Sequence, residues 1–370
     1  MNIVICTANL ENTSGYNLVP RYTAIELAKM GQNVMVMCIK KPNKLISGEE
    51  KITFYEIGRE NLIKIPFATK KLDDFQPNII YSHGVALTDL LGTRYAVKKD
   101  VILFTAVHTN FSKFVANLIP IKNFDSAKLN TIVEKLALKQ LLKSTVVFAL
   151  TEEMKSYLKS LGLNNVELLS NGVDLEAFEP THFDISKVKK VKLLSVGQIS
   201  QRKNQLFLVE TAKYLKPNII LQIAGGETWD KLYYIKFTDY LKQYKPKNVE
   251  YLGLVEHNEI PNLYKKAHVY VASSLLEAQS LAQIEAIACG LPTVRLFGEN
   301  TKGITENNVT AIHIPENSTP KDFAEAINLL VTDAKTYNKL RENCLIERSR
   351  YSWKATANGV LETMKKYIVC

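Results

Sequence analysis

The stretch that decides the fold runs from His268 to Phe297 and reads HVYVASSLLEAQSLAQIEAIACGLPTVRLF. It opens with a β-branched apolar run at His268–Ala272 and continues with apolar residues at helical spacing over Leu281–Cys289. A Gly-x-Pro turn then leads into a second apolar run at Thr293–Leu296. A strand, a helix and a strand in this order predict a βαβ unit, in which the two strands run parallel.

The same alternation of short apolar runs and longer helical patterns fills the rest of the chain, in two successive series. The first series of strands is predicted at Asn2–Thr7, Asn33–Ile39, Thr53–Ile57, Asn78–Ser82, Val101–Thr105, Thr145–Leu150 and Val166–Leu169. The second is predicted at Lys192–Val196, Ile219–Ala224, Val249–Leu252, His268–Ala272, Thr293–Leu296 and Ala311–Ile314. The main helices between them are predicted at Tyr16–Met30, Ile132–Leu142, Glu152–Leu161, Asn204–Tyr214, Lys231–Gln243, Ile260–Lys266, Leu281–Cys289 and Pro320–Thr332. The pattern is typical of an α/β protein with parallel sheets.

The length of the chain and a break between the two series indicate two domains. At 370 residues the chain is too long for one ordinary core. The polar stretch Asp174–Lys190 contains Pro180 and has no periodicity, which is typical of a linker. We predict an N-terminal Rossmann-like domain at 1–175, a linker at 176–190, a C-terminal Rossmann-like domain at 191–352 and a closing amphipathic helix at 353–370.

Composition excludes several classes of protein. The hydrophobic content of 46% and charged content of 23% are those of a globular domain, and no apolar run reaches the ~18 residues of a membrane span. The net charge of +10 is spread along the chain without a nucleic-acid recognition motif, so we expect no nucleic-acid partner. The five cysteines are odd in number and widely spaced, which predicts reduced thiols. The opening MNIVIC shows no signal-peptide pattern, so we expect a cytoplasmic protein.

Two glutamates flank the start of the predicted helix at Leu281. Glu277 lies in the polar turn before it, and Glu285 lies one turn into it. The amides from Ala278 and Gln279 to Ser280 and Leu281 can hold a diphosphate, because a helix N-terminus has unpaired N–H groups and a positive dipole end. A carboxylate accepts two hydrogen bonds from a vicinal diol, so Glu285 can hold a ribose and Glu277 a sugar. An isolated pair of acids here is more often only a favourable helix start.

The surrounding sequence favours the binding hypothesis, because the stretch resembles the signature of the retaining nucleotide-sugar glycosyltransferases of family 4. That signature is two glutamates with seven residues between them, then a small-residue helix and a Gly-x-Pro turn, here Glu277, Glu285 and EAIACGLPTV. The resemblance implies the GT-B fold: two Rossmann-like domains with parallel sheets facing across a cleft, and a C-terminal helix packing back on the N-terminal domain. The family signature often has glycine at the position of Ser280.

Three further segments are similar to the family. LLSVGQISQRKNQLFLVETA, Leu193–Ala212, resembles the strand, glycine and lysine that clamp the donor diphosphate, which implies donor contacts for Gly197 and Lys203. The family arginine is replaced by Gln198, and Arg202 is the candidate to compensate. LLSNGVDLEAFEP resembles the junction between the domains, with a hinge role. Gly15 resembles the opening glycine loop, where a missing side chain lets the backbone approach a phosphate.

Two histidines follow predicted strands, His83 in NIIYSHG and His108 in LFTAVHTN. Both lie where open α/β sheets bind ligands, at the carboxyl ends of parallel strands. His108 matches the family histidine that contacts the transferred sugar, and His83 matches a less uniform position facing the cleft. A histidine at a strand end is more often a hydrogen-bonded structural residue.

The resemblance implies a reaction. A sugar passes with retention from a nucleotide sugar to a glycan or lipid-linked acceptor, with Glu277, His108 and Lys203 as catalytic residues. No Asp-x-Asp cluster is present, so no metal and no cofactor are expected. A UDP-sugar is favoured as the donor substrate, with a GDP-sugar as the alternative. The lysines and the apolar FVANLIPIKNF within Lys113–Lys143 favour peripheral contact with the cytoplasmic face of an anionic membrane, although a solvated helix face is equally compatible.

Two other functions remain open. A protein that binds nucleotide sugars without transferring them would fit Gln198 and Ser280. A GT-B epimerase would convert the donor without an acceptor. A phosphorylase is disfavoured because no pyridoxal-lysine context is found, and a dinucleotide dehydrogenase because no Gly-x-Gly-x-x-Gly follows the first strand.

Overall fold

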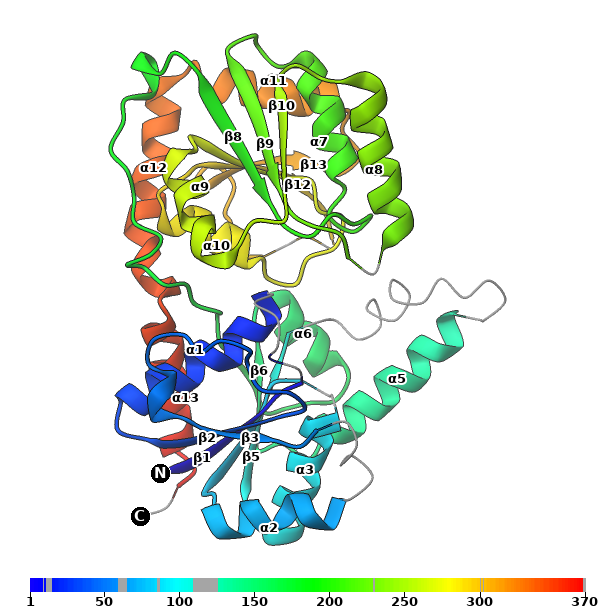
Figure 1. Ribbon diagram of the computed structural model, residues 1–370, viewed down its shortest axis with the longest axis vertical. Helices are drawn as coiled ribbons and strands as arrows, with labels where there is room; N and C mark the ends of the chain where they lie inside the picture. The colour runs from blue at the N-terminus through cyan, green and yellow to red at the C-terminus, as the bar shows by residue number, and fades with distance from the viewer. Residues whose placement is uncertain are drawn as a thin grey trace. The chain divides into compact units, whose positions relative to one another are not determined.

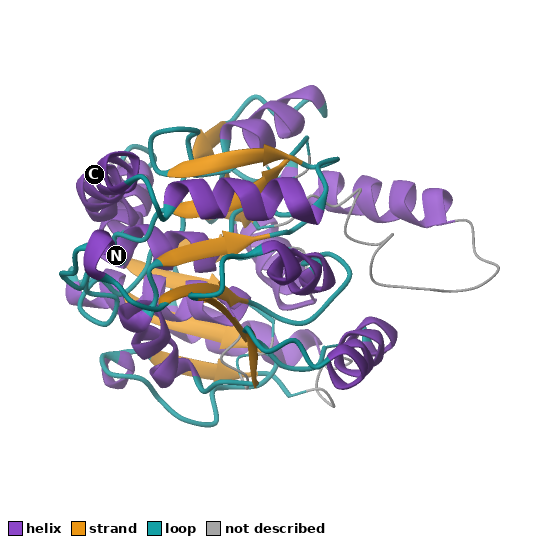
Figure 2. Cartoon of the chain, turned by 90° about the horizontal axis from the view of Figure 1, so that it is seen from above, coloured by secondary structure: helices purple, strands orange, loops and turns teal. Residues whose placement is uncertain are grey.

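The computed structural model describes residues 1–8, 10, 15–58, 65–84, 87–108, 126–228, 230–299, 301 and 303–368. These residues form two compact units. The first comprises Met1–Gly172 together with Trp353–Cys370, and the second comprises Val173–Ser352. Each unit is a parallel sheet with helices on both of its faces (Figure 1; Figure 2).

The first unit is built on a seven-stranded parallel sheet in the order β3-β2-β1-β4-β5-β6-β7. Its strands are β1 (Asn2–Cys6), β2 (Asn33–Cys38), β3 (Thr53–Glu56), β4 (Ile79–Ser82), β5 (Ile102–Val107), β6 (Val146–Ala149) and β7 (Val166–Leu168). Its helices are α1 (Gly15–Lys29), α2 (Ile65–Phe75), α3 (Leu87–Lys99), α5 (Ser126–Leu141), α6 (Glu152–Ser160) and α13 (Trp353–Lys365). The order reverses between β1 and β4, which makes this the switch point of the sheet.

Alternate side chains of each strand supply the two cores of the first unit. In β1, Ile3 and Ile5 pack with α1 and α13, whereas Val4 and Cys6 pack on the opposite face with α2 and α3. Successive side chains of a strand point to opposite faces, so a strand covered on both faces must be apolar throughout. This explains why these strands read as continuous apolar runs.

The second unit is built on a six-stranded parallel sheet in the order β10-β9-β8-β11-β12-β13. Its strands are β8 (Val191–Val196), β9 (Ile219–Ala224), β10 (Val249–Gly253), β11 (Val269–Ala272), β12 (Thr293–Phe297) and β13 (Ala311–Pro315). Its helices are α7 (Gln205–Thr211), α8 (Lys231–Tyr244), α9 (Ile260–Lys266), α10 (Leu281–Ala288), α11 (Pro320–Leu330) and α12 (Ala334–Glu347). Helices α7, α8 and α11 contribute to the core on one face, and α9 and α10 to the core on the other (Figure 1). The switch point lies between β8 and β11.

The last helix, α13, belongs to the first unit although it follows the whole of the second in sequence. Trp353 stacks on Tyr22 of α1 with ring centroids 5.1 Å apart, and Thr356 donates a 2.9 Å hydrogen bond to the carbonyl of Ser170. Val360 and Met364 are buried in the core that also holds Ile3 and Ile5 of β1. The predicted packing of the C-terminal helix on the N-terminal domain is therefore confirmed.

The division between the units differs from the predicted limits. It falls between Gly172 and Val173, ahead of the predicted linker at 176–190. Phe178 and Ile185, within that segment, are buried in the two cores of the second unit. The polar composition of the segment predicted a linker, but these two apolar side chains bind it to the second sheet.

None of the helices within the described residues combines the length and the apolar character that crossing a membrane requires.

Candidate active site

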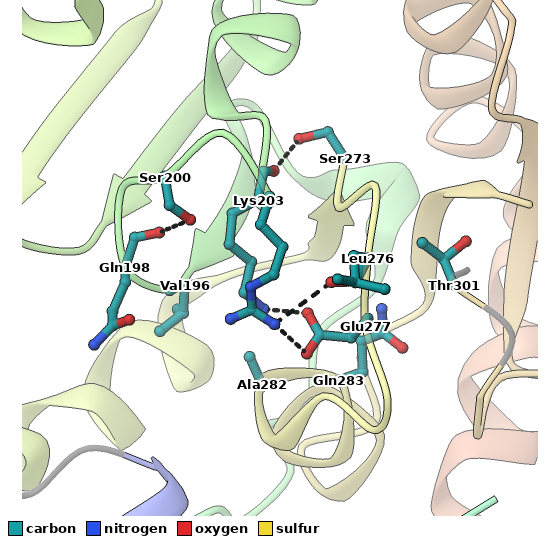
Figure 3. A network of polar contacts seen from close by, with 12 residues as sticks. Val196, Gln198, Ser200, Lys203, Ser273, Leu276, Glu277, Ala282, Gln283 and Thr301 are labelled. Carbon is teal, nitrogen blue, oxygen red and sulfur yellow. Dashed lines mark hydrogen bonds and ion pairs between the residues drawn. The ribbon is translucent and has the colours of Figure 1, made fainter. Parts of the chain in front are cut away.

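Lys203 and Glu277 form an ion pair in the second unit, although 74 residues separate them in sequence. Lys203 Nζ donates to Glu277 Oε2, and Arg202 Nη1 lies 3.5 Å from Glu277 Oε1 (Figure 3). The Lys203 and Glu277 side chains are only 14% and 10% exposed. The cluster follows the carboxyl ends of β8 and β11, the strands that flank the switch point. Open α/β sheets bind ligands at this place.

Backbone contacts fix the segment after β8 against the segment after β11. The Ser200 carbonyl accepts hydrogen bonds from the amides of Lys203 and Asn204, both at 3.0 Å, which close a tight turn. Ser273 Oγ, just after β11, donates to the carbonyls of Lys203 and Asn204 at 2.9 and 2.8 Å (Figure 3). The Leu275 amide donates to the Arg202 carbonyl at 2.8 Å. Both charged partners are therefore held by backbone before any ligand binds.

Gly197 lets the Lys203 side chain cross the end of β8. Its φ of +153° lies in the region that favours glycine. A Cβ built on Gly197 would meet Lys203 Cε at 3.4 Å, and the neighbouring Gly225 already packs against the Gly197 backbone so closely that its own Cβ would lie 1.9 Å from the Gly197 carbonyl oxygen. The predicted role of Gly197 in contacting a diphosphate stays a prediction, whereas its role in giving Lys203 room is a property of the fold.

The charges of this cluster stabilise one another. Burial acts to raise the pKa of Glu277, but the positive charges of Lys203, Arg202 and Arg295 outweigh it and hold that pKa below its ordinary value. Burial lowers the pKa of Lys203 even though Glu277 acts in the opposite direction. An ionised Glu277 among several cations leaves the cluster with a surplus of positive charge, which suits an anionic ligand.

The N-terminus of α10 lies next to Glu277 along the chain. Ser280 precedes the helix without capping it through its side chain, so the amides of the first turn are not taken up by Ser280. Gln279 and Ser280 are buried, and Ala278 and Leu281 are partly buried. The predicted diphosphate-binding segment is therefore a helix start beside the cation cluster.

Glu285 lies in the middle of α10 and is partly buried. Burial raises its pKa to about 7, although the Tyr264 hydroxyl and the Lys203 charge act in the opposite direction. The same hydroxyl donates a 2.9 Å hydrogen bond to the Ala282 carbonyl, which ties α9 to the first turn of α10. A carboxyl that titrates near neutral pH in this position can accept hydrogen bonds from a diol once it is ionised.

Gln198 takes no part in the ion-pair cluster. Its side chain is exposed and points away from Lys203 and Glu277 (Figure 3). Its carbonyl accepts a 2.9 Å hydrogen bond from Gln205 Nε2, which fixes the loop after β8. Arg202, rather than a side chain at position 198, therefore brings the second cation to Glu277.

His83 and His108 lie together in the first unit, after β4 and β5. His83 Nδ1 is 3.1 Å from His108 Nε2, and the rings stack with centroids 5.3 Å apart. Burial lowers the pKa of His108 to about 4. Burial and the neighbouring His108 also hold the pKa of His83 well below its ordinary value. The pair is therefore neutral at physiological pH, with one ring donating and the other accepting the shared hydrogen bond.

The remaining predicted positions are placed as follows. Gly15 is the first residue of α1, in the first unit. Asn171 is buried near the end of the main segment of that unit. Asp174 Oδ1 accepts hydrogen bonds from the amides of Glu176 and Ala177 at 3.0 and 3.1 Å, which confirms the predicted capping role. The basic and apolar FVANLIPIKNF stretch lies outside the described residues.

Sequence reasoning missed one residue of the cluster, Arg295. It lies in β12 within TVRLF and is only 2% exposed. An arginine inside an otherwise apolar strand is rare unless its charge and its donors have partners, and that rarity was the available signal.

Known proteins match both units. Residues 178–344 match the family model described as Glycosyl transferases group 1, and residues 14–177 match the one described as Glycosyltransferase Family 4. A UDP-Gal:α-D-GlcNAc-diphosphoundecaprenol α-1,3-galactosyltransferase of Escherichia coli is 32% identical over 195 residues, 48% of each chain. The spore coat protein SA of Bacillus subtilis is 27% identical over 219 residues, 53% of this chain and 57% of its own. The aligned stretch thus spans about half the length of these relatives.

Solved structures match the whole chain. A sucrose-phosphate synthase of Thermosynechococcus elongatus covers 98% of both chains with a TM-score of 0.78 and 18% identity. Anabaena HepE, solved in complex with UDP-glucose, covers 98% of this chain and 99% of its own, with a TM-score of 0.76 and 15% identity. Two Rossmann-like units of this kind define the GT-B class of fold. Within that class, the chain belongs to the group 1 and family 4 glycosyltransferases.

Proposed function

We propose that this protein transfers a sugar from a nucleotide-diphosphate sugar to a glycan or lipid-linked acceptor, without a metal ion and with retention of configuration, in the synthesis of a glycoconjugate or cell-surface polysaccharide. The observation that carries the proposal is the Lys203–Glu277 ion pair with Arg202 beside it, at the switch point of the second sheet and at the start of α10. A cation cluster at a helix N-terminus is suited to a diphosphate, and a carboxylate within it to sugar hydroxyls.

Departure of the diphosphate is the step that these residues serve. As the bond to the anomeric carbon breaks, negative charge grows on the leaving phosphate and positive charge on the sugar. Lys203 and Arg202, with the first-turn amides of α10, stabilise the phosphate, and Glu277 holds the sugar and stabilises its positive charge. Electrostatic stabilisation by fixed groups is strong because the surroundings do not have to reorganise during the reaction.

The acceptor then attacks from the face that the diphosphate leaves. Its proton passes to the departing phosphate, and the new bond keeps the configuration of the old one. No protein nucleophile is needed in this scheme, so we assign none. His108 contacts a hydroxyl of the transferred sugar. Its neutral form, which its low pKa ensures, can exchange a hydrogen bond with a hydroxyl without adding charge near the sugar cation.

A UDP-sugar is the proposed donor, and a GDP-sugar is the alternative. The E. coli relative carries UDP-Gal in its name, and HepE was solved with UDP-glucose. The same E. coli name includes a diphosphoundecaprenol acceptor, which supports a lipid-linked acceptor for this chain.

We propose that the first unit contacts an anionic membrane surface through α5, which would suit a lipid-linked acceptor at the cytoplasmic face. Leu136 and Leu142 of this segment are 63% and 58% exposed, and Lys139 and Lys143 are exposed beside them. Apolar area together with cationic charge is what binds a peripheral protein to anionic lipid. Vesicles of phosphatidylglycerol should sediment with the parent protein but less with a Lys139→Glu, Lys143→Glu variant. Equal binding of both would contradict the contact.

Turnover tests the reaction itself. The protein is incubated with UDP- and GDP-sugars and a panel of glycan and lipid-linked acceptors, with and without EDTA, and products are identified by mass spectrometry. We expect a glycosylated acceptor and free nucleoside diphosphate in both conditions, with an NMR coupling at the anomeric carbon that matches the donor. A Glu277→Gln variant should bind the donor yet form little product, because the amide cannot stabilise positive charge on the sugar.

The competing functions give different results in the same assay. A donor that changes configuration without any acceptor would identify an epimerase. A nucleotide sugar that binds but yields no product with any acceptor would identify a binding protein. Loss of activity in EDTA would overturn metal independence and leave transfer standing.

A further inference from the structure

Arg295 carries a buried charge in the second unit that the reaction scheme above does not use. It lies in β12, in register with Ala272 of β11 on one side and His313 of β13 on the other. Because Ala272 is the last residue of β11, Arg295 lies directly beside the start of the segment that carries Glu277. Its exposed fraction is 2%, and a buried charge is costly unless its surroundings compensate for it.

The hydrogen bonds of Arg295 are all made to neutral groups. Nη1 donates to Gln283 Oε1 and to Thr305 Oγ1, each at 3.0 Å, and Nε donates to the Leu296 carbonyl at 3.3 Å. Nη2 donates to the Thr301 carbonyl. Within the part of the chain that the structure describes, no carboxylate forms an ion pair with this guanidinium. Its donors are satisfied, but its charge is not neutralised by a direct contact.

The groups around Arg295 do not supply a negative charge either. Thr305 Oγ1 accepts from Arg295 and so directs its own hydrogen to His313 Nε2, 3.1 Å away. Burial and the Arg295 charge lower the pKa of His313 to about 4, so this histidine is neutral. Phe297, the next aromatic ring along β12, lies 5.8 Å from the guanidinium.

The charge of Arg295 is felt at the ion-pair cluster. Among the groups that act on the pKa of Glu277, the three cations are Lys203, Arg202 and Arg295. In turn, Glu277 acts to raise the pKa of Arg295 against the effect of burial, which lowers it to about 10. Arg295 is therefore charged at neutral pH, and Glu277 alone does not balance the three cations.

We infer that Arg295 is a positioning residue whose buried positive charge helps to draw the diphosphate of the nucleotide sugar to the Lys203–Glu277 cluster, without touching it. The guanidinium is enclosed and its donors are engaged by neutral acceptors, so it acts through its field rather than through contact. The inference rests on the proposed function, because it needs an anionic donor. It also supplies a cation in a chain that has Gln198 where its family has an arginine.

Calorimetry with UDP and with uridine separates this effect from a structural one. Arg295→Met removes the charge, and Arg295→Lys keeps it while losing the fork of donors. We expect Arg295→Met to weaken UDP binding about tenfold relative to uridine, the size of a unit charge acting over ~10 Å in a partly polar medium. Arg295→Lys should retain most of the preference for UDP. A residue that only supported the fold would change the binding of both ligands together.

Arg341→Met is the matched control. Arg341 is also buried in the second unit and also donates to backbone carbonyls, those of Gly290 and Thr181. Its loss should lower the melting temperature without changing the ratio of UDP to uridine affinity. An unchanged ratio in Arg295→Met, or an equal change in Arg341→Met, would overturn the inference. If Arg295→Met does not fold, a loss of the UDP preference in Arg295→Lys overturns it instead.

The parent protein distinguishes this failure from failure of the proposed function. UDP and uridine are replaced by GDP and guanosine if the parent prefers guanine. A parent that binds neither diphosphate refutes the proposed function and the inference with it. A parent that binds one of them while the variants keep its selectivity refutes only the role of Arg295.

Discussion

The two units place different chemistry at the same structural position. In the first, the strands β4 and β5 end in His83 and His108, and burial keeps both rings neutral. In the second, the segments after β8 and β11 bring together Lys203 and Glu277, and opposite charges keep Glu277 ionised in spite of burial. Burial thus gives opposite outcomes, because only the second pair has partners of opposite charge. One sheet end is suited to neutral hydroxyls and the other to an anion.

Removal of Lys203 should break this contrast most severely. Lys203→Ala takes away a cation of the second unit and leaves Glu277 buried without its main partner. We expect kcat/KM for sugar transfer to fall by about 10²–10³-fold, the usual loss when one electrostatic contact to a developing charge is removed. Steady-state kinetics with the donor identified by the turnover assay measure it. Lys213→Ala is the control, since Lys213 pairs with Glu210 on the surface, and an equal loss there would contradict the assignment.

Glu285 sharpens the contrast through pH. Its pKa of about 7 means that the carboxylate that accepts ribose hydroxyls is lost as pH falls through 7. Donor affinity should therefore rise between pH 6 and pH 8, by up to tenfold per unit below the pKa, and then level off. Glu285→Gln should bind less tightly and lose this rise. The nucleotide phosphate also titrates near pH ~6, so any slope that remains in the glutamine variant belongs to the ligand.

The histidine pair should give the smallest effect and no pH dependence of its own. His83→Phe removes the partner of His108 Nε2, at a cost of roughly one buried hydrogen bond, or about tenfold in kcat/KM. His83→Asn, whose amide lies near the position of Nδ1, should keep most of the activity. Since both pKa values lie far below neutrality, neither variant should change the slope between pH 6 and pH 8. A changed slope would show that this pair, and not Glu285, titrates there.

The sequence predicted the sheets well because their strands are buried on both faces. Runs such as IIYS in β4 and VYVA in β11 are apolar throughout, and little else in the chain is. Helix α12 was not predicted, because polar residues separate its buried positions. Tyr337, Leu340 and Cys344 nevertheless have helical spacing, so the signal was present but weak.

Contacts between distant residues could not be predicted in the same way. The residue types at positions 203 and 277 suggested a shared site through family resemblance, but their ion pair depends on β8 and β11 being neighbours in the sheet. The hydrogen bond between His83 and His108 depends likewise on the pairing of β4 with β5. Arg295 was missed because its partners come from α10 and from the segment after β12, which no local pattern links to it.

The position of α13 affects how the chain can mature during synthesis. The helix fills the same core as β1, yet it is the last described helix to be translated. Domains usually fold in the order in which they leave the ribosome. Here the second unit has all its strands and helices first, and the earlier-made sheet waits for Trp353–Lys365 before its apolar surface is fully covered. A stop codon near the end of the gene would therefore damage the unit at the beginning of the chain.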